Sequence, residues 1–71
     1  MGNKNDFIKI SVDTLGSETS IKNIIRGLNS SYLRNDNYFF RLFGSKKEIS
    51  HELKKYNNLI NNIEIINLIN N

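Results

Sequence analysis

The chain has 71 residues and a mass of 8.3 kDa, so it holds one small domain at most. It contains no cysteine and a single histidine, which excludes a disulfide framework, a thiolate metal cluster and an imidazole-rich metal site. The net charge of +3 comes from 10 basic residues scattered among 7 acidic ones. No basic block is present, so we expect no nucleic-acid partner.

The first half of the chain predicts a strand followed by a helix. Residues 1–6 form a polar tail, and residues 7–71 hold a partial α/β domain. Apolar and polar side chains alternate over residues 7–13, which is typical of a strand. Residues 18–31 carry one apolar stripe at helical spacing, with Ser17 or Thr19 as the N-cap. The stripe consists of Ile21, Ile24, Ile25, Leu28 and Tyr32.

The second half predicts a strand, a helix and a further strand. Residues 38–43 are aromatic and mostly apolar, as expected of a strand buried on both faces. Ser45 and Glu48 have the spacing of a capping box, so a helix is predicted over residues 45–57. The isoleucine-rich run that follows predicts a strand over residues 63–69.

The alternation of strand and helix indicates an α/β fold, a β-α-β-α-β unit with parallel strands. Parallel strands are normally covered by helices on both faces. Two helices cannot cover both faces of three strands, and two strand edges also remain open. We therefore expect the chain either to associate with itself or a partner, or to be the opening part of a larger sheet.

Ligands in open α/β sheets bind at the carboxyl ends of the strands, which directs attention to residues 13–19, 44–47 and the tail after residue 69. The first loop carries hydroxyls and a glycine at the start of a helix, where an anion can bind. Asp13 and Glu18 would repel phosphate there, so an ordinary strand-to-helix turn is the alternative interpretation. His51 lies off the apolar stripe of its helix and is expected to be solvated. No catalytic residue can be assigned from these residue types.

The stretch from Ile8 to Glu18 resembles the opening of the bacterial phosphate acyltransferases of fatty acid and phospholipid synthesis, the PlsX family. In that family the first strand runs into D-A-M-G-G-D. Asp13 and Gly16 match this pattern, whereas Thr14, Leu15, Ser17 and Glu18 depart from it. The resemblance continues through the first helix, the strand that ends at Gly44 and the strand from Ile63 to Ile66.

The resemblance implies transfer of a fatty acyl group from acyl carrier protein to inorganic phosphate, which gives acyl phosphate for a membrane glycerol-3-phosphate acyltransferase. It implies no cofactor and no metal, and a three-layer α/β/α fold like that of isopropylmalate dehydrogenases and phosphotransacetylases. Strand order 2-1-3 and helices on opposite faces are expected. Asp13, Thr14, Gly16 and Ser17 are the candidate residues of the phosphate loop, and Thr14, Gly16 and Ser17 are those expected to contact phosphate or the thioester.

Members of this family are several times longer than 71 residues, so we expect a truncated or split relative that is inactive alone. Its partners would be acyl carrier protein, the membrane acyltransferase and a missing C-terminal remainder, or further copies of the chain. The expected location is the cytoplasm, including the membrane periphery. A non-enzymatic interaction module that completes a sheet with a partner chain is one alternative, and a non-functional gene remnant is another.

Overall fold

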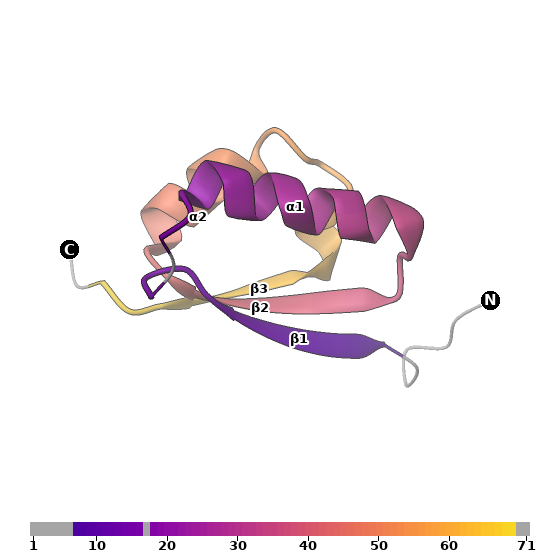
Figure 1. The fold of residues 1–71 in the computed structure, drawn as a ribbon, viewed down its shortest axis with the longest axis horizontal. Helices are drawn as coiled ribbons and strands as arrows, with labels where there is room; N and C mark the ends of the chain where they lie inside the picture. The colour runs from indigo at the N-terminus through magenta and orange to yellow at the C-terminus, as the bar shows by residue number, and fades with distance from the viewer. Residues whose placement is uncertain (1–6, 17, 70–71) are drawn as a thin grey trace.

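The computed structural model describes residues 7–16 and 18–69 of the chain, and it has the predicted β-α-β-α-β order (Figure 1). The sheet contains β1 (Ile8–Asp13), β2 (Tyr38–Gly44) and β3 (Ile63–Asn67), all parallel. The connecting elements are α1 (Ile21–Arg34), α2 (Lys46–Leu53) and a short 3₁₀ helix, η2 (Leu59–Asn62). The α/β fold is thus confirmed. The polar tail predicted for residues 1–6 lies outside the described residues.

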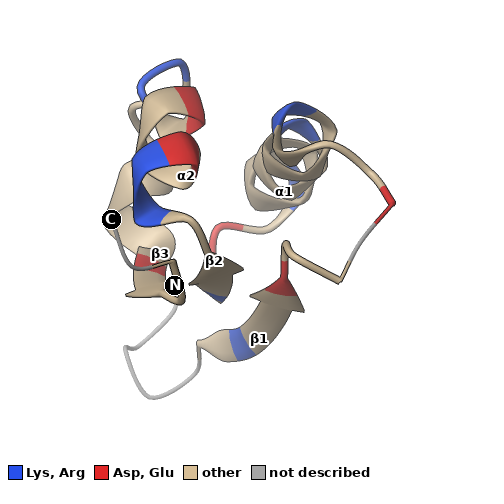
Figure 2. Cartoon of the chain, turned by 90° about the vertical axis from the view of Figure 1, so that its left-hand side faces the viewer, with Lys and Arg blue, Asp and Glu red and all other residues tan. Residues whose placement is uncertain are grey.

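The strand order differs from the expected 2-1-3, because β2 and not β1 is the central strand. Ile10 is paired with Phe40, and Phe40 in turn with Ile63. Both crossovers therefore step in the same direction across the sheet. Two crossovers of the same hand that step in the same direction place their helices on one face. Accordingly, α1 and α2 contact each other on the same side of the sheet, and the expectation of helices on opposite faces is wrong (Figures 1 and 2).

The helices also begin and end at other residues than the sequence predicts. Ser20, and not the predicted Ser17 or Thr19, is the N-cap of α1, and its hydroxyl accepts a hydrogen bond from the Asn23 amide at 3.3 Å. Ser45 caps α2 as predicted and accepts from the Glu48 amide at 3.2 Å, although the Glu48 carboxylate does not return a bond to Ser45. α2 ends at Leu53, before the predicted residue 57. Beyond its end the Tyr56 amide donates to the Leu53 carbonyl in a turn, because the asparagine pair that follows favours turns over helix.

The central strand alternates between the two faces instead of being buried on both. Phe40 and Leu42 are buried beneath the helices, whereas Phe39 and Phe43 are half-buried on the opposite face. Arg41 lies on that opposite face too and is exposed. The prediction of a strand buried on both faces is therefore wrong, because no helix of the described chain covers the second face.

The core lies between the sheet and the two helices. Each element contributes to it, and the short η2 helix closes it next to β3. Its buried members are Ile25, Phe40, Leu42, Ile49, Leu53 and Leu59. The strand β1 contributes only half-buried side chains, because it stands at the edge of the sheet.

Asn62 joins the turn before β2 to the start of β3. Its buried side-chain amide donates to the carbonyl of Asp36 at 3.1 Å and to that of Tyr38 at 2.7 Å. Asp36 belongs to the turn before β2 and Tyr38 is the first residue of β2, so one side chain holds the beginning of β3 beside β2.

Replacing Asn62 with alanine is expected to lower the free energy of unfolding by about 1–3 kcal/mol, because two carbonyls lose their donor in a partly buried place. Urea unfolding followed by circular dichroism measures this. The exposed neighbour Asn61 is the matched control, and its replacement by alanine is expected to change stability by less than about 0.5 kcal/mol. Equal effects at the two positions would contradict the assigned role of Asn62.

Neither helix in the described part of the chain has the length and apolar character needed to pass through a lipid bilayer.

Candidate functional site

The loop after β1 is organised by the side chain of Asp13. Its Oδ1 accepts hydrogen bonds from the amides of Leu15 at 2.9 Å and Gly16 at 3.1 Å, which makes a tight turn at the carboxyl end of the strand. A β-carbon on Gly16 would lie 2.8 Å from Asp13 Oδ2, so close approach explains the glycine. The two amides are therefore used within the turn.

Thr14 is buried, and it bonds across the sheet to the end of β2. Its amide donates to the Phe43 carbonyl at 2.9 Å, and its hydroxyl donates to the same oxygen at 3.0 Å. Thr14 thus ties the loop to β2. Ser17, the fourth candidate from the sequence, lies outside the described residues.

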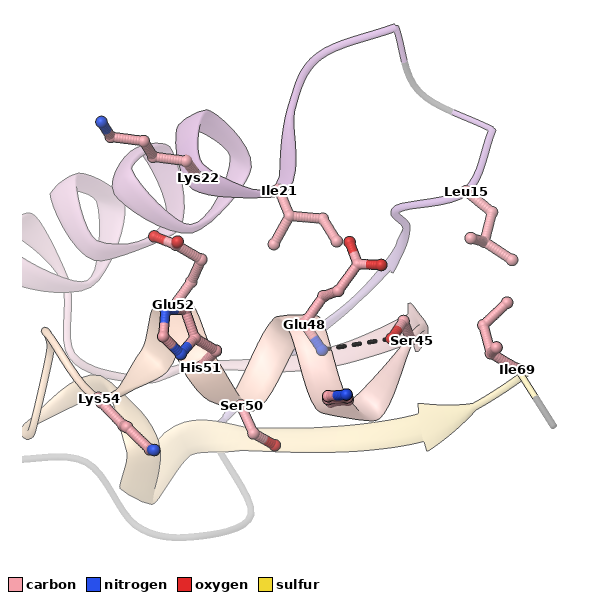
Figure 3. Close-up of a pocket in the computed structure, with 11 residues that line it drawn as sticks. Leu15, Ile21, Lys22, Ser45, Glu48, Ser50, His51, Glu52, Lys54 and Ile69 are labelled. Carbon is pink, nitrogen blue, oxygen red and sulfur yellow. Dashed lines mark hydrogen bonds between the residues drawn. The ribbon is translucent and has the colours of Figure 1, made fainter. Parts of the chain in front are cut away.

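The three loops expected to carry a ligand do converge at the carboxyl edge of the sheet, beside an open hollow of about 950 Å³ (Figure 3). Leu15 comes from the first loop, Ser45 from the second and Ile69 from the segment after β3. Ile21, at the start of α1, adds a further apolar side chain to this wall. The side chains of Leu15, Ile21 and Ile69 are directed toward the same space (Figure 3).

The opposite wall of the hollow is charged and is formed mainly by α2. Three lysines and two glutamates line the hollow, which leaves one positive charge in excess when His51 is neutral. The charged residues are Lys22, Lys47, Lys54, Glu48 and Glu52. Glu52 also pairs with Lys55 at 3.0 Å. His51 is exposed at the rim, in agreement with the sequence prediction.

The hollow offers an apolar wall next to a weakly cationic one, which suits a ligand with an apolar and an anionic part. No group of three metal-ligating side chains occurs within residues 7–16 and 18–69. Asp13, Thr14 and Gly16 shape the loop that brings Leu15 to the hollow, and they do not line it themselves.

The chain is 42% identical over 49 residues to a protein from Pelagibacter ubique (strain HTCC1062) named phosphate acyltransferase. The chain is a partial relative of a phosphate acyltransferase. The match covers 69% of this chain and 15% of the Pelagibacter relative, so the chain spans a small part of that relative's length. No family model matches the chain, and no solved structure matches it.

The sequence predicted the loops of the hollow but not all the side chains that line it. The sequence predicted a helix for Ile21 and Lys22 and no role in a site for either, whereas Lys47 belongs to one of the predicted loops. The sequence did contain a signal for Ile21 and Lys22, because the first residues of a helix that follows a parallel strand lie at the carboxyl edge of the sheet. The approach of α1 to α2 on one face brings Ile21 and Lys22 to the hollow, and this placement depends on the strand order.

Proposed function

We propose that this β-α-β-α-β unit serves acyl transfer to phosphate, as one part of a phosphate acyltransferase of the PlsX type. The observation that carries the proposal is the 42% identity to the Pelagibacter phosphate acyltransferase over 49 residues. The open hollow at the carboxyl edge of the sheet supports it, because substrates of α/β proteins bind at that edge.

In this proposal the two walls of the hollow take different parts of the substrates. Leu15, Ile21 and Ile69 contact the acyl group, since they form the apolar wall. Lys47 contributes positive charge for inorganic phosphate, next to the capped start of α2. Asp13, Thr14 and Gly16 hold the loop in place, and Ser17 remains a candidate for direct contact with phosphate.

The proposed reaction moves an acyl group from a thioester to phosphate. A phosphate oxygen attacks the thioester carbonyl carbon, a carbon–oxygen bond forms, the carbon–sulfur bond breaks and the thiolate leaves with acyl carrier protein. No cofactor takes part. The acyl phosphate then passes to a membrane glycerol-3-phosphate acyltransferase, which fits a cytoplasmic protein at the membrane periphery.

The isolated 71 residues are expected to be inactive, because the hollow is open and no helix within residues 7–16 and 18–69 covers the second face of the sheet. Further α/β structure, from a remainder of the protein or from another chain, would have to close the site. Acyl phosphate formation by the purified chain alone, trapped as the hydroxamate, would refute this part of the proposal.

A graft tests the function itself. Residues 7–69 replace the segment of the Pelagibacter relative that contains the 49 matched residues, and acyl phosphate formation from acyl carrier protein thioester and phosphate is measured. We expect the graft to be active, and Lys47→Ala in the graft to raise the KM for phosphate about tenfold or more through loss of a charged contact.

Lys46→Ala is the matched control for this graft, because Lys46 is an exposed lysine next to Lys47 on α2 that does not line the hollow. It is expected to leave the KM for phosphate unchanged. A folded graft without activity would argue against the acyltransferase function and favour the non-enzymatic interaction module. The observations that favour this second function are the sheet face and the strand edges that the described residues leave uncovered.

A further inference from the structure

The outer edge of β1 carries a row of backbone groups without a partner strand in the described chain. β1 pairs with β2 alone. The Ile8 amide donates to the Asn37 carbonyl, and the Thr14 amide donates to the Phe43 carbonyl. Successive residues of a strand point their amides to opposite sides, so Lys9, Ser11 and Asp13 direct their amides and carbonyls outward.

The side chains of β1 are also incompletely covered. On the helix-covered side, Ile8 is 46% exposed, and Ile10 and Val12 are only half-buried. The neighbouring positions of β2, Phe40 and Leu42, are fully buried. An added strand beside β1 would cover the apolar side chains that the chain itself leaves partly in water.

We propose that β1 pairs with β1 of a second copy, antiparallel, about a two-fold axis at Ser11. The result is a symmetric dimer with one continuous six-stranded sheet. In this register Ser11 lies opposite Ser11 of the second copy, and both are hydrogen-bonded through the outward amides and carbonyls. Ile10 lies opposite Val12 of the second copy, on the side covered by the helices.

Charge complementarity favours a second copy of this chain as the partner of β1, and it also favours this register. Lys9 lies opposite Asp13 of the second copy, and the same pair occurs again on the other side of the axis. The two charges are the basic and acidic segments of β1 in Figure 2. Both side chains are exposed, and Asp13 uses Oδ1 for its own turn, which leaves Oδ2 for the lysine.

The other edge, β3, lacks this self-complementarity. The Leu68 amide donates to the Gly44 carbonyl, so Ile63, Ile65 and Asn67 point their backbone groups outward. A two-fold axis at Ile65 would place Ile63 opposite Asn67 of the second copy. The Asn67 side chain is already occupied, since it accepts from the Lys46 amide and bonds to Ile69. β1 is therefore the edge that suits a second copy.

Single cysteines test the register, because the natural chain has none. In Ser11→Cys the two Cα atoms would be about 5.5 Å apart across the axis, which is within disulfide range. In Lys9→Cys they would be about 13 Å apart, since four residues separate the two positions along the strands. We expect oxidation to link Ser11→Cys into a covalent dimer and to leave Lys9→Cys unlinked on a denaturing gel.

Sedimentation equilibrium of the unmodified chain is expected to show a dimer. Lys9→Glu places a carboxylate opposite Asp13 of the second copy on both sides of the axis, and is expected to raise the dissociation constant of the dimer about tenfold or more. Lys9→Arg keeps the positive charge and is expected to leave this constant unchanged. Circular dichroism confirms that each variant is folded. A chain that stays monomeric, equal linking of the two cysteine variants, or a dimer indifferent to Lys9→Glu overturns the proposal. None of these measurements depends on acyl transfer.

Discussion

Phe40→Ala is expected to lower the free energy of unfolding by about 3–5 kcal/mol, because it leaves a cavity in the centre of the core. Phe40 is 1% exposed, lies on the central strand and stacks on Tyr38 with ring centroids 5.8 Å apart. A domain of this size has a total stability of about 4–11 kcal/mol. The variant is therefore expected to lose a large share of its stability, with a Tm lower by about 12 °C or more in thermal unfolding.

Phe39→Ala is the matched control, since it removes the same side chain from the adjacent position. Phe39 lies on the uncovered face, half-buried, with Phe7 as its ring neighbour at 6.4 Å. Its removal is expected to lower the free energy of unfolding by about 1 kcal/mol. A Phe39→Ala effect as large as that of Phe40→Ala would mean that the face opposite the helices is buried in solution, against the fold described above.

The order of elements was predictable because each has its own local signal. The alternation around Ile10 and the Ser45 cap depend only on neighbours in the sequence, and both are found in the structure. The strand order is a different kind of property. It depends on contacts such as that of Asn62 with Tyr38, which are remote in sequence, and no periodicity encodes them.

The site was predictable as a set of loops but not as a set of side chains. Parallel strands end at one edge, so the convergence of the loops follows from the fold class. Whether a loop hydroxyl faces a ligand or the sheet depends on packing. The Thr14 hydroxyl is directed to the Phe43 carbonyl because Gly44 leaves room beside it, and this requires the register of β1 against β2.

Gly44→Ala is expected to lower the free energy of unfolding by about 2–4 kcal/mol, through overpacking and the loss of the Thr14 hydroxyl bond. Gly44 is buried at the end of β2, and a β-carbon there would collide with Thr14 Oγ1. The same β-carbon would lie 3.4 Å from Thr14 Cβ and 3.5 Å from Ile49 Cδ1, so little space remains for relaxation. Urea unfolding measures the loss.

A double-mutant cycle with Thr14→Ala assigns the cause. Removal of Oγ1 relieves the collision. Thr14→Ala is therefore expected to lower the free energy of unfolding less in the Gly44→Ala background than in the unmodified chain, with a coupling energy of about 0.5–3 kcal/mol. Gly27→Ala is the control for glycine replacement as such. Gly27 is exposed on α1, and nothing lies within 4 Å of a β-carbon added to it. Gly27→Ala is therefore expected to raise the free energy of unfolding by about 0.5–1 kcal/mol. Additive effects of Thr14→Ala and Gly44→Ala would show that the two side chains do not meet, and that the loop after β1 is held to β2 by backbone hydrogen bonds alone.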